Sequence, residues 1–145
     1  MSVSNKRLFR TVAILAIFGV AVSAVSLQRH YATSKTQYCD IGETFNCDIV
    51  NRSQYSSILG IPVALIGMLG YAAIAGMATI YRERPDTPTN LFAAATAGLA
   101  FALYLTYIEG HVLGVWCILC LSSLALITVT AALSASIWWT RDQRE

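Results

Sequence analysis

The sequence has 145 residues, of which 56% are hydrophobic and only 12% are charged. Soluble domains carry about 25% charged residues, so this composition indicates a membrane protein, and the length fits one domain. The formal net charge of +2 is small and the Lys and Arg residues are scattered, which argues against nucleic-acid binding. We therefore treat residues 1–145 as a single membrane domain.

Four apolar stretches follow one another along the chain, and each is long enough to cross a bilayer as a helix. They cover about residues 8–27, 58–81, 91–108 and 116–139. The pattern predicts an all-α membrane protein, in which four transmembrane helices form a bundle.

The first stretch also has features of a cleavable signal peptide. The basic residues Lys6, Arg7 and Arg10 lie before it or at its start, and Val22-Ser23-Ala24 resembles a small-residue cleavage site. We expect it to be retained as a helix, because the three later spans need a partner to pack against.

A polar segment, residues 28–57, connects the first two spans and carries Cys39 and Cys47. A connection of this length usually has a function of its own. Part of it, for instance residues 51–59, could be helical. Because proline is tolerated only in the first turn of a helix, the regular part of the second span should begin close to Pro62.

The basic residues are unevenly divided between the two faces that four spans create. The face with both termini and the second connection has Lys6, Arg7, Arg10, Arg82, Arg84, Arg141 and Arg144, against Arg29, Lys35 and Arg52 on the other. The positive-inside rule therefore predicts cytoplasmic termini. The long loop and the turn at residues 109–114 should lie outside, and all four cysteines with them, where disulfides persist.

Cys117 and Cys120 form a Cys-x-x-Cys pair directly before the last apolar run. Residues three apart on a helix share a face, so the two thiols should be close enough to form a disulfide. Cys117 should lie in the first turn, where unpaired backbone N–H groups carry partial positive charge and favour the reactive thiolate.

Cys39 and Cys47, on a flexible loop, could pair with each other or swing to meet Cys117. Because thiol–disulfide exchange passes through a mixed disulfide, a mobile pair beside a fixed pair would make a relay. Two alternatives remain open at this point. The cysteines could form two structural disulfides, or they could bind zinc, although the spacing from Cys39 to Cys47 does not suit a zinc site.

Three motifs together resemble one family. They are Tyr38-Cys39-Asp40-Ile41-Gly42-Glu43-Thr44-Phe45-Asn46-Cys47, then Ser56-Ser57-Ile58-Leu59-Gly60-Ile61-Pro62, and Cys117-Ile118-Leu119-Cys120. Their order and spacing are similar to those of the bacterial branch of the vitamin K epoxide reductase (VKOR) family, over nearly the whole chain.

The resemblance implies a four-helix bundle around a quinone. Cys39 and Cys47 would be the shuttle pair and Cys117 and Cys120 the active-site pair. Cys39 would face the external redox partner, Cys47 would exchange with Cys117, and Cys120 would lie next to the quinone. Ser56, in the position of a quinone-contacting Asn of animal members, is a second candidate contact.

The resemblance also indicates the substrate and partner. Ser56 replaces that Asn, and Leu124 replaces an animal Tyr. Both differences suit a bacterial inner-membrane enzyme that reduces a plain quinone, menaquinone or ubiquinone, without a metal. Many bacterial members carry a fused thioredoxin-like domain. This sequence stops at Glu145, so we expect a separate thioredoxin-fold partner, DsbA-like, and a DsbB-like role in disulfide formation.

Glu109 and His111 flank the outer turn and could handle protons, although ordinary solvation at the membrane interface is the interpretation we favour. The predicted function is thiol:quinone oxidoreductase. The alternative is a non-enzymatic membrane scaffold or assembly factor with structural disulfides.

Overall fold

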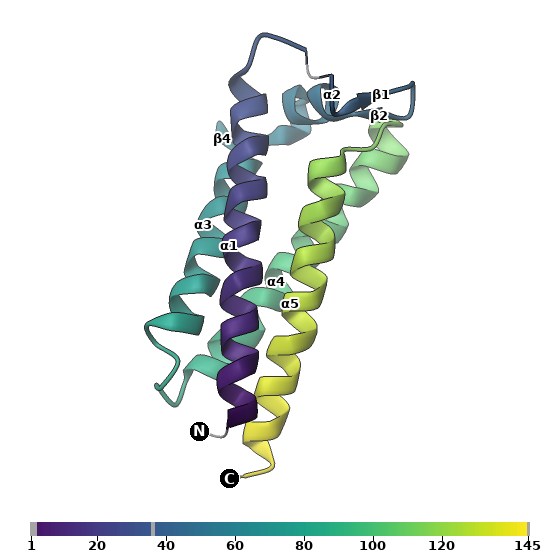
Figure 1. Cartoon of the computed structure of the whole chain (residues 1–145). Coiled ribbons are helices and arrows are strands. Elements are labelled where there is room, and N and C mark those ends of the chain that lie inside the picture. The colour runs from purple at the N-terminus through teal and green to yellow at the C-terminus, as the bar shows by residue number, and fades with distance from the viewer. Residues whose placement is uncertain (1–2, 36, 145) are drawn as a thin grey trace.

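The computed structural model describes residues 3–35 and 37–144. Met1, Ser2, Thr36 and Glu145 lie outside the described residues, so the outermost positions of the expected domain and one position of the expected loop are not covered. The chain is largely helical, and its four longest helices run side by side as a bundle (Figure 1). They are α1 (Val3–Tyr31), α3 (Val63–Thr79), α4 (Thr87–Ile108) and α5 (Ile118–Asp142).

The helices have the length and composition of a membrane protein. Among the described residues, three helical segments are long and apolar enough to span a bilayer: α1, residues 87–113, and α5. The fourth, α3, is apolar but has only 17 residues. This bears out the prediction of an all-α membrane protein.

A hairpin explains why α3 is short. Strands β3 (Ser57–Ile58) and β4 (Ile61–Pro62) pair antiparallel across a two-residue turn, Leu59 and Gly60. Both turn residues have positive φ, of 53° and 81°, as this tight kind of turn requires. The helix then begins directly after Pro62, as the proline predicts.

The segment before this hairpin is only partly helical. Helix α2 (Cys47–Arg52) and a 3-10 turn, η1 (Gln54–Ser56), occupy the region in which we expected helix as far as residue 59. Ser57 and Ile58 are strand residues instead, because they pair with β4.

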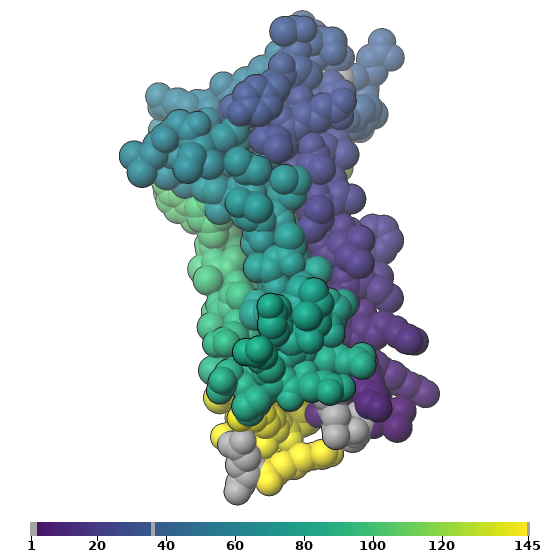
Figure 2. Space-filling model, turned by 90° about the vertical axis from the view of Figure 1, so that its left-hand side faces the viewer, coloured from purple at the N-terminus to yellow at the C-terminus, as the bar shows by residue number. Residues whose placement is uncertain are grey.

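The bundle core lies where α1, α3 and α5 meet. Tyr71 of α3 is buried against α1, and an ideal Cβ on Gly19 would lie 2.3 Å from its ring. Glycine is therefore what lets α1 and α3 approach so closely. The Tyr71 hydroxyl donates to the Ser123 carbonyl oxygen of α5 at 2.8 Å, which joins a third helix to this contact. Figure 2 shows α3, in teal, lying directly against α1, in purple.

The two termini lie at one end of the bundle, whereas α2 and strands β1 (Asp40–Ile41) and β2 (Phe45–Asn46) cover the other end (Figure 1). At that second end α4 continues into a π-helical turn, η2 (Glu109–Leu113), which stops at Gly114 with φ 67°. We expected a plain turn here. The extra helical turn brings Glu109 next to the start of α5.

Candidate redox site

A small hairpin brings Cys39 and Cys47 together. Strands β1 and β2 pair antiparallel with Asp40 opposite Asn46, so the two cysteines flank the last pair of the ladder. Gly42, at φ 68°, supplies the left-handed residue of the turn. The two Cα atoms are 5.6 Å apart, a separation typical of disulfides, and the two sulfur atoms are bonded. Of the pairings that the sequence left open, the structure has Cys39–Cys47.

Backbone hydrogen bonds hold this hairpin against the segment before α5. The Asn46 N–H donates to the Trp116 carbonyl at 3.0 Å, and the Trp116 N–H donates to the Thr44 carbonyl at 2.9 Å. Cys47 directly follows Asn46 and Cys117 directly follows Trp116, so these bonds set the two cysteines beside each other. The loop that we expected to be flexible is therefore docked on the segment that precedes α5.

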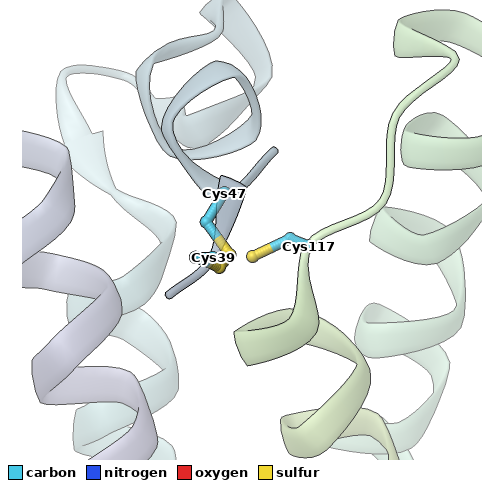
Figure 3. Close-up of side chains that lie close together, drawn as sticks. All are labelled: Cys39, Cys47 and Cys117. Atoms are coloured by element: carbon cyan, nitrogen blue, oxygen red, sulfur yellow. A yellow bond between two sulfur atoms is a disulfide. The ribbon is translucent and has the colours of Figure 1, made fainter. Parts of the chain in front are cut away.

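The disulfide and the Cys117 thiol face each other across this junction. Figure 3 shows the Cys117 side chain pointing toward the disulfide, and the sulfur atoms of Cys39, Cys47 and Cys117 all lie within 4.8 Å of one another. Three sulfurs at this spacing could approach one metal ion. Two of them form a disulfide, however, and zinc binds thiolates, so the donor set in this state does not fit zinc.

Cys117 is the N-cap of α5 and not a residue of its first turn. Its backbone is extended (φ −110°, ψ 118°), and its side chain is completely buried. A hydrogen bond from the Cys120 thiol lowers the pKa of the Cys117 thiol, while burial and the charge of Glu109 act in the opposite direction. The pKa of the Cys117 thiol is thus lowered, and the largest cause is the second cysteine of the motif rather than a position in the first helical turn.

Asn51 is a site residue that sequence reasoning missed. It is buried on α2, and its Nδ2 donates to the Cys47 carbonyl oxygen at 3.0 Å and approaches the Cys117 sulfur at 3.8 Å. A hydrogen-bond donor next to the Cys117 sulfur favours the thiolate form of this cysteine. Residues four apart on a helix share a face, so Asn51 lies on the same face of α2 as Cys47. The sequence alone does not show this relation, because it does not reveal that α2 starts at Cys47.

A cavity of about 390 Å³ lies between the helices beneath the hairpin. Its walls are mostly apolar side chains of α1, α3, α4 and α5. The polar groups that reach it include Ser56 and Cys120, the two candidate quinone contacts, together with His30 and Glu109. The structure thus brings Ser56 and Cys120 to one cavity. The two cysteines of the motif face different sides of the site, because Cys117 faces the loop disulfide and Cys120 faces the cavity.

Glu109 and His111 are in different environments. His111 is exposed and stacks on Tyr107, with ring centroids 4.5 Å apart. Glu109 is only 2% exposed, and its Oε2 accepts a hydrogen bond from the Cys117 N–H at 3.1 Å. Solvation at the interface is therefore the wrong interpretation for Glu109, because the π-helical turn rotates it toward α5.

The family comparison agrees with this site. A family model described as the vitamin K epoxide reductase family matches residues 10–135. The chain belongs to this family. The matched range includes all four cysteines and the cavity between the helices. Membership in the VKOR family, together with the Cys39–Cys47 disulfide beside two free thiols, makes the protein a membrane thiol oxidoreductase.

Proposed function

We propose that this VKOR-family protein is a quinone-dependent thiol–disulfide oxidoreductase of the cell envelope. It reoxidises a separate thioredoxin-fold, DsbA-like partner and so supports disulfide formation in exported proteins. Electrons pass from the partner to Cys39/Cys47, then to Cys117/Cys120, and then to a quinone. The observation that carries this proposal is that the loop disulfide faces Cys117 while Cys120 opens into an apolar cavity.

The internal transfer is a thiol–disulfide exchange between two pairs. A thiolate of the reduced loop pair, Cys47 by the family pattern, attacks Cys117 of the Cys117–Cys120 disulfide. The second loop thiolate then closes Cys39–Cys47 and releases Cys117. Both pairs are needed because exchange proceeds through a mixed disulfide. The state in the structure, with Cys39–Cys47 bonded and Cys117 and Cys120 free, corresponds to the products of this exchange.

The cavity suits a quinone ring. Its apolar walls and few polar groups are typical of sites for small, largely apolar ligands. A bound quinone, menaquinone or ubiquinone, would accept two electrons and two protons. Cys120 would lie beside it, and Ser56 would orient it. The Ser56 hydroxyl donates to the Ser53 carbonyl at 2.6 Å, so it would have to turn to donate to a ligand.

The proposed setting is the bacterial inner membrane, with cytoplasmic termini and all four cysteines on the extracytoplasmic face. The charge bias of the sequence supports this orientation. The arrangement of the bundle is consistent with it, since the termini and the redox site lie at opposite ends (Figure 1). The scaffold alternative, with two structural disulfides, is disfavoured because Cys117 and Cys120 are free thiols.

Quinone reduction by the purified protein tests this function. In lipid nanodiscs, the protein should reduce a menaquinone or ubiquinone analogue when a reduced DsbA-like protein is supplied, as followed by quinone absorbance. Cys117→Ser should lower the rate to background, and Thr128→Ser, an exposed change elsewhere on α5, should leave it unchanged. Full activity in Cys117→Ser would disprove the proposed path, and no quinone reduction by the wild type would disprove the function.

A further inference from the structure

Glu109 is a buried acid that the electron path described above does not use. One oxygen, Oε2, accepts the Cys117 N–H at 3.1 Å. The other, Oε1, is buried and has no hydrogen-bond partner at normal distance among the described residues. The Cys120 thiol lines the same cavity as Glu109 and interacts electrostatically with its carboxyl group. The acid therefore lies beside the Cys-x-x-Cys motif, bonded to the backbone of Cys117 and sharing the cavity with Cys120.

The surroundings of Glu109 favour proton exchange. No described lysine or arginine lines the cavity, and Glu109 has no ion-pair partner in the described part of the chain. An isolated carboxylate in an apolar environment is stabilised by taking up a proton. The other titratable groups that line the cavity are His30 of α1, Tyr55 of η1, Tyr71 of α3 and Cys120 of α5. Of these, Cys120 is the one with which Glu109 interacts.

We infer that Glu109 gives a proton to Cys120 when the Cys117–Cys120 disulfide opens. This inference rests on the internal exchange in the proposed function but not on the quinone. It adds a residue to the redox machinery that lies eight positions before the Cys-x-x-Cys motif.

A loop thiolate attacks the Cys117 sulfur, so a bond forms between these two sulfurs, the Cys117–Cys120 bond breaks, and the electron pair leaves on Cys120. Glu109 transfers its carboxyl proton to the Cys120 thiolate, which prevents that thiolate from reversing the attack. The second loop thiolate then forms Cys39–Cys47 and expels Cys117 as a thiolate. Glu109 recovers a proton from solvent.

Two substitutions separate proton transfer from positioning. Glu109→Gln keeps an oxygen that can accept the Cys117 N–H, but it cannot exchange a proton. Glu109→Ala loses both abilities. The matched control is Glu43→Gln, which changes an exposed glutamate in the hairpin turn at the same end of the molecule.

The experiment measures the internal exchange without quinone. Fully oxidised full-length protein in nanodiscs is mixed with dithiothreitol, quenched with acid at successive times and alkylated, and mass spectrometry gives the rate at which Cys117/Cys120 become reduced. A Cys39→Ser/Cys47→Ser variant corrects for direct reduction of the helical pair. Rates are compared across pH for the wild type and each variant.

We expect Glu109→Gln to slow the exchange on the order of 100-fold at pH values where Glu109 is protonated, the usual scale of general acid catalysis. The ratio of wild-type to variant rate should fall toward one as the pH rises and Glu109 loses its proton. Glu43→Gln should match the wild type at every pH.

Two results would overturn the inference: a Glu109→Gln variant that exchanges as fast as the wild type, and a Glu109→Gln variant that is slower by the same factor at every pH. If Glu109→Gln is as fast as the wild type and Glu109→Ala is slow, Glu109 is a positioning residue for the Cys117 backbone. Because no quinone is present, failure of quinone reduction would not affect these outcomes.

Discussion

Removing Cys39 and Cys120 together should make Cys47 and Cys117 form a stable disulfide. In the Cys39→Ser/Cys120→Ser variant no third thiol is left to resolve this bond. The backbone hydrogen bonds of Trp116 already hold the two partners side by side, and their sulfur atoms lie within 4.8 Å. Non-reducing mass spectrometry after mild oxidation should find the bond in nearly all molecules. Turnover should fall roughly a thousand-fold or more, as when a nucleophile is lost.

The matched control is Cys39→Ser/Cys117→Ser, which leaves Cys47 and Cys120. Cys120 lies on the cavity side and is not part of the three-sulfur cluster, so the same oxidation should join few of these pairs. Equal cross-linking in both variants would mean that the docked geometry does not direct the exchange.

Replacing Gly19 with alanine should destabilise the bundle more than any other glycine-to-alanine change within the helices. The added Cβ would lie 2.3 Å from the Tyr71 ring, and Tyr71 cannot move away freely because its hydroxyl is hydrogen-bonded to Ser123. Overpacking of this kind costs about 1–3 kcal/mol. Reversible unfolding in mixed micelles, followed by helical circular dichroism, should show this loss in the free energy of unfolding.

Gly76→Ala is the matched control for this prediction. It lies on α3, and nothing would come within 4 Å of its new Cβ. Alanine has a higher helix propensity than glycine by about 1 kcal/mol, so this change should be neutral or stabilising. A Gly19→Ala variant as stable as Gly76→Ala would show that the α1–α3 contact has room for the methyl group.

Much of this architecture could be predicted from local sequence. Apolar runs of spanning length predicted the helices, and Pro62 predicted where α3 begins. The family motifs predicted that the four cysteines lie at one site and that Ser56 lies at the same cavity as Cys120. These features depend on composition and short spacings, which a single sequence displays directly.

What sequence could not predict depends on contacts between distant segments. The donor from Asn51 to Cys117 joins residues 66 positions apart, and the hairpin is held through Trp116, far along the chain. Burial of Glu109 depends on a π-helical turn, for which the sequence pattern gives no recognised signal. Cys117 likewise became an N-cap because the segment before it extends to pair with the hairpin.

In the proposed relay electrons enter through the loop pair, which can be tested by comparing two electron donors of different size. The Cys39→Ser/Cys47→Ser variant in quinone-loaded nanodiscs is given either a reduced DsbA-like protein or dithiothreitol, and quinone absorbance is followed for each donor. The relay predicts that the variant loses reduction driven by the protein donor but keeps reduction driven by the small dithiol, which can reach Cys117/Cys120 itself. If the protein donor still drives quinone reduction at the wild-type rate, the loop pair is not the entry point and the proposed relay does not operate.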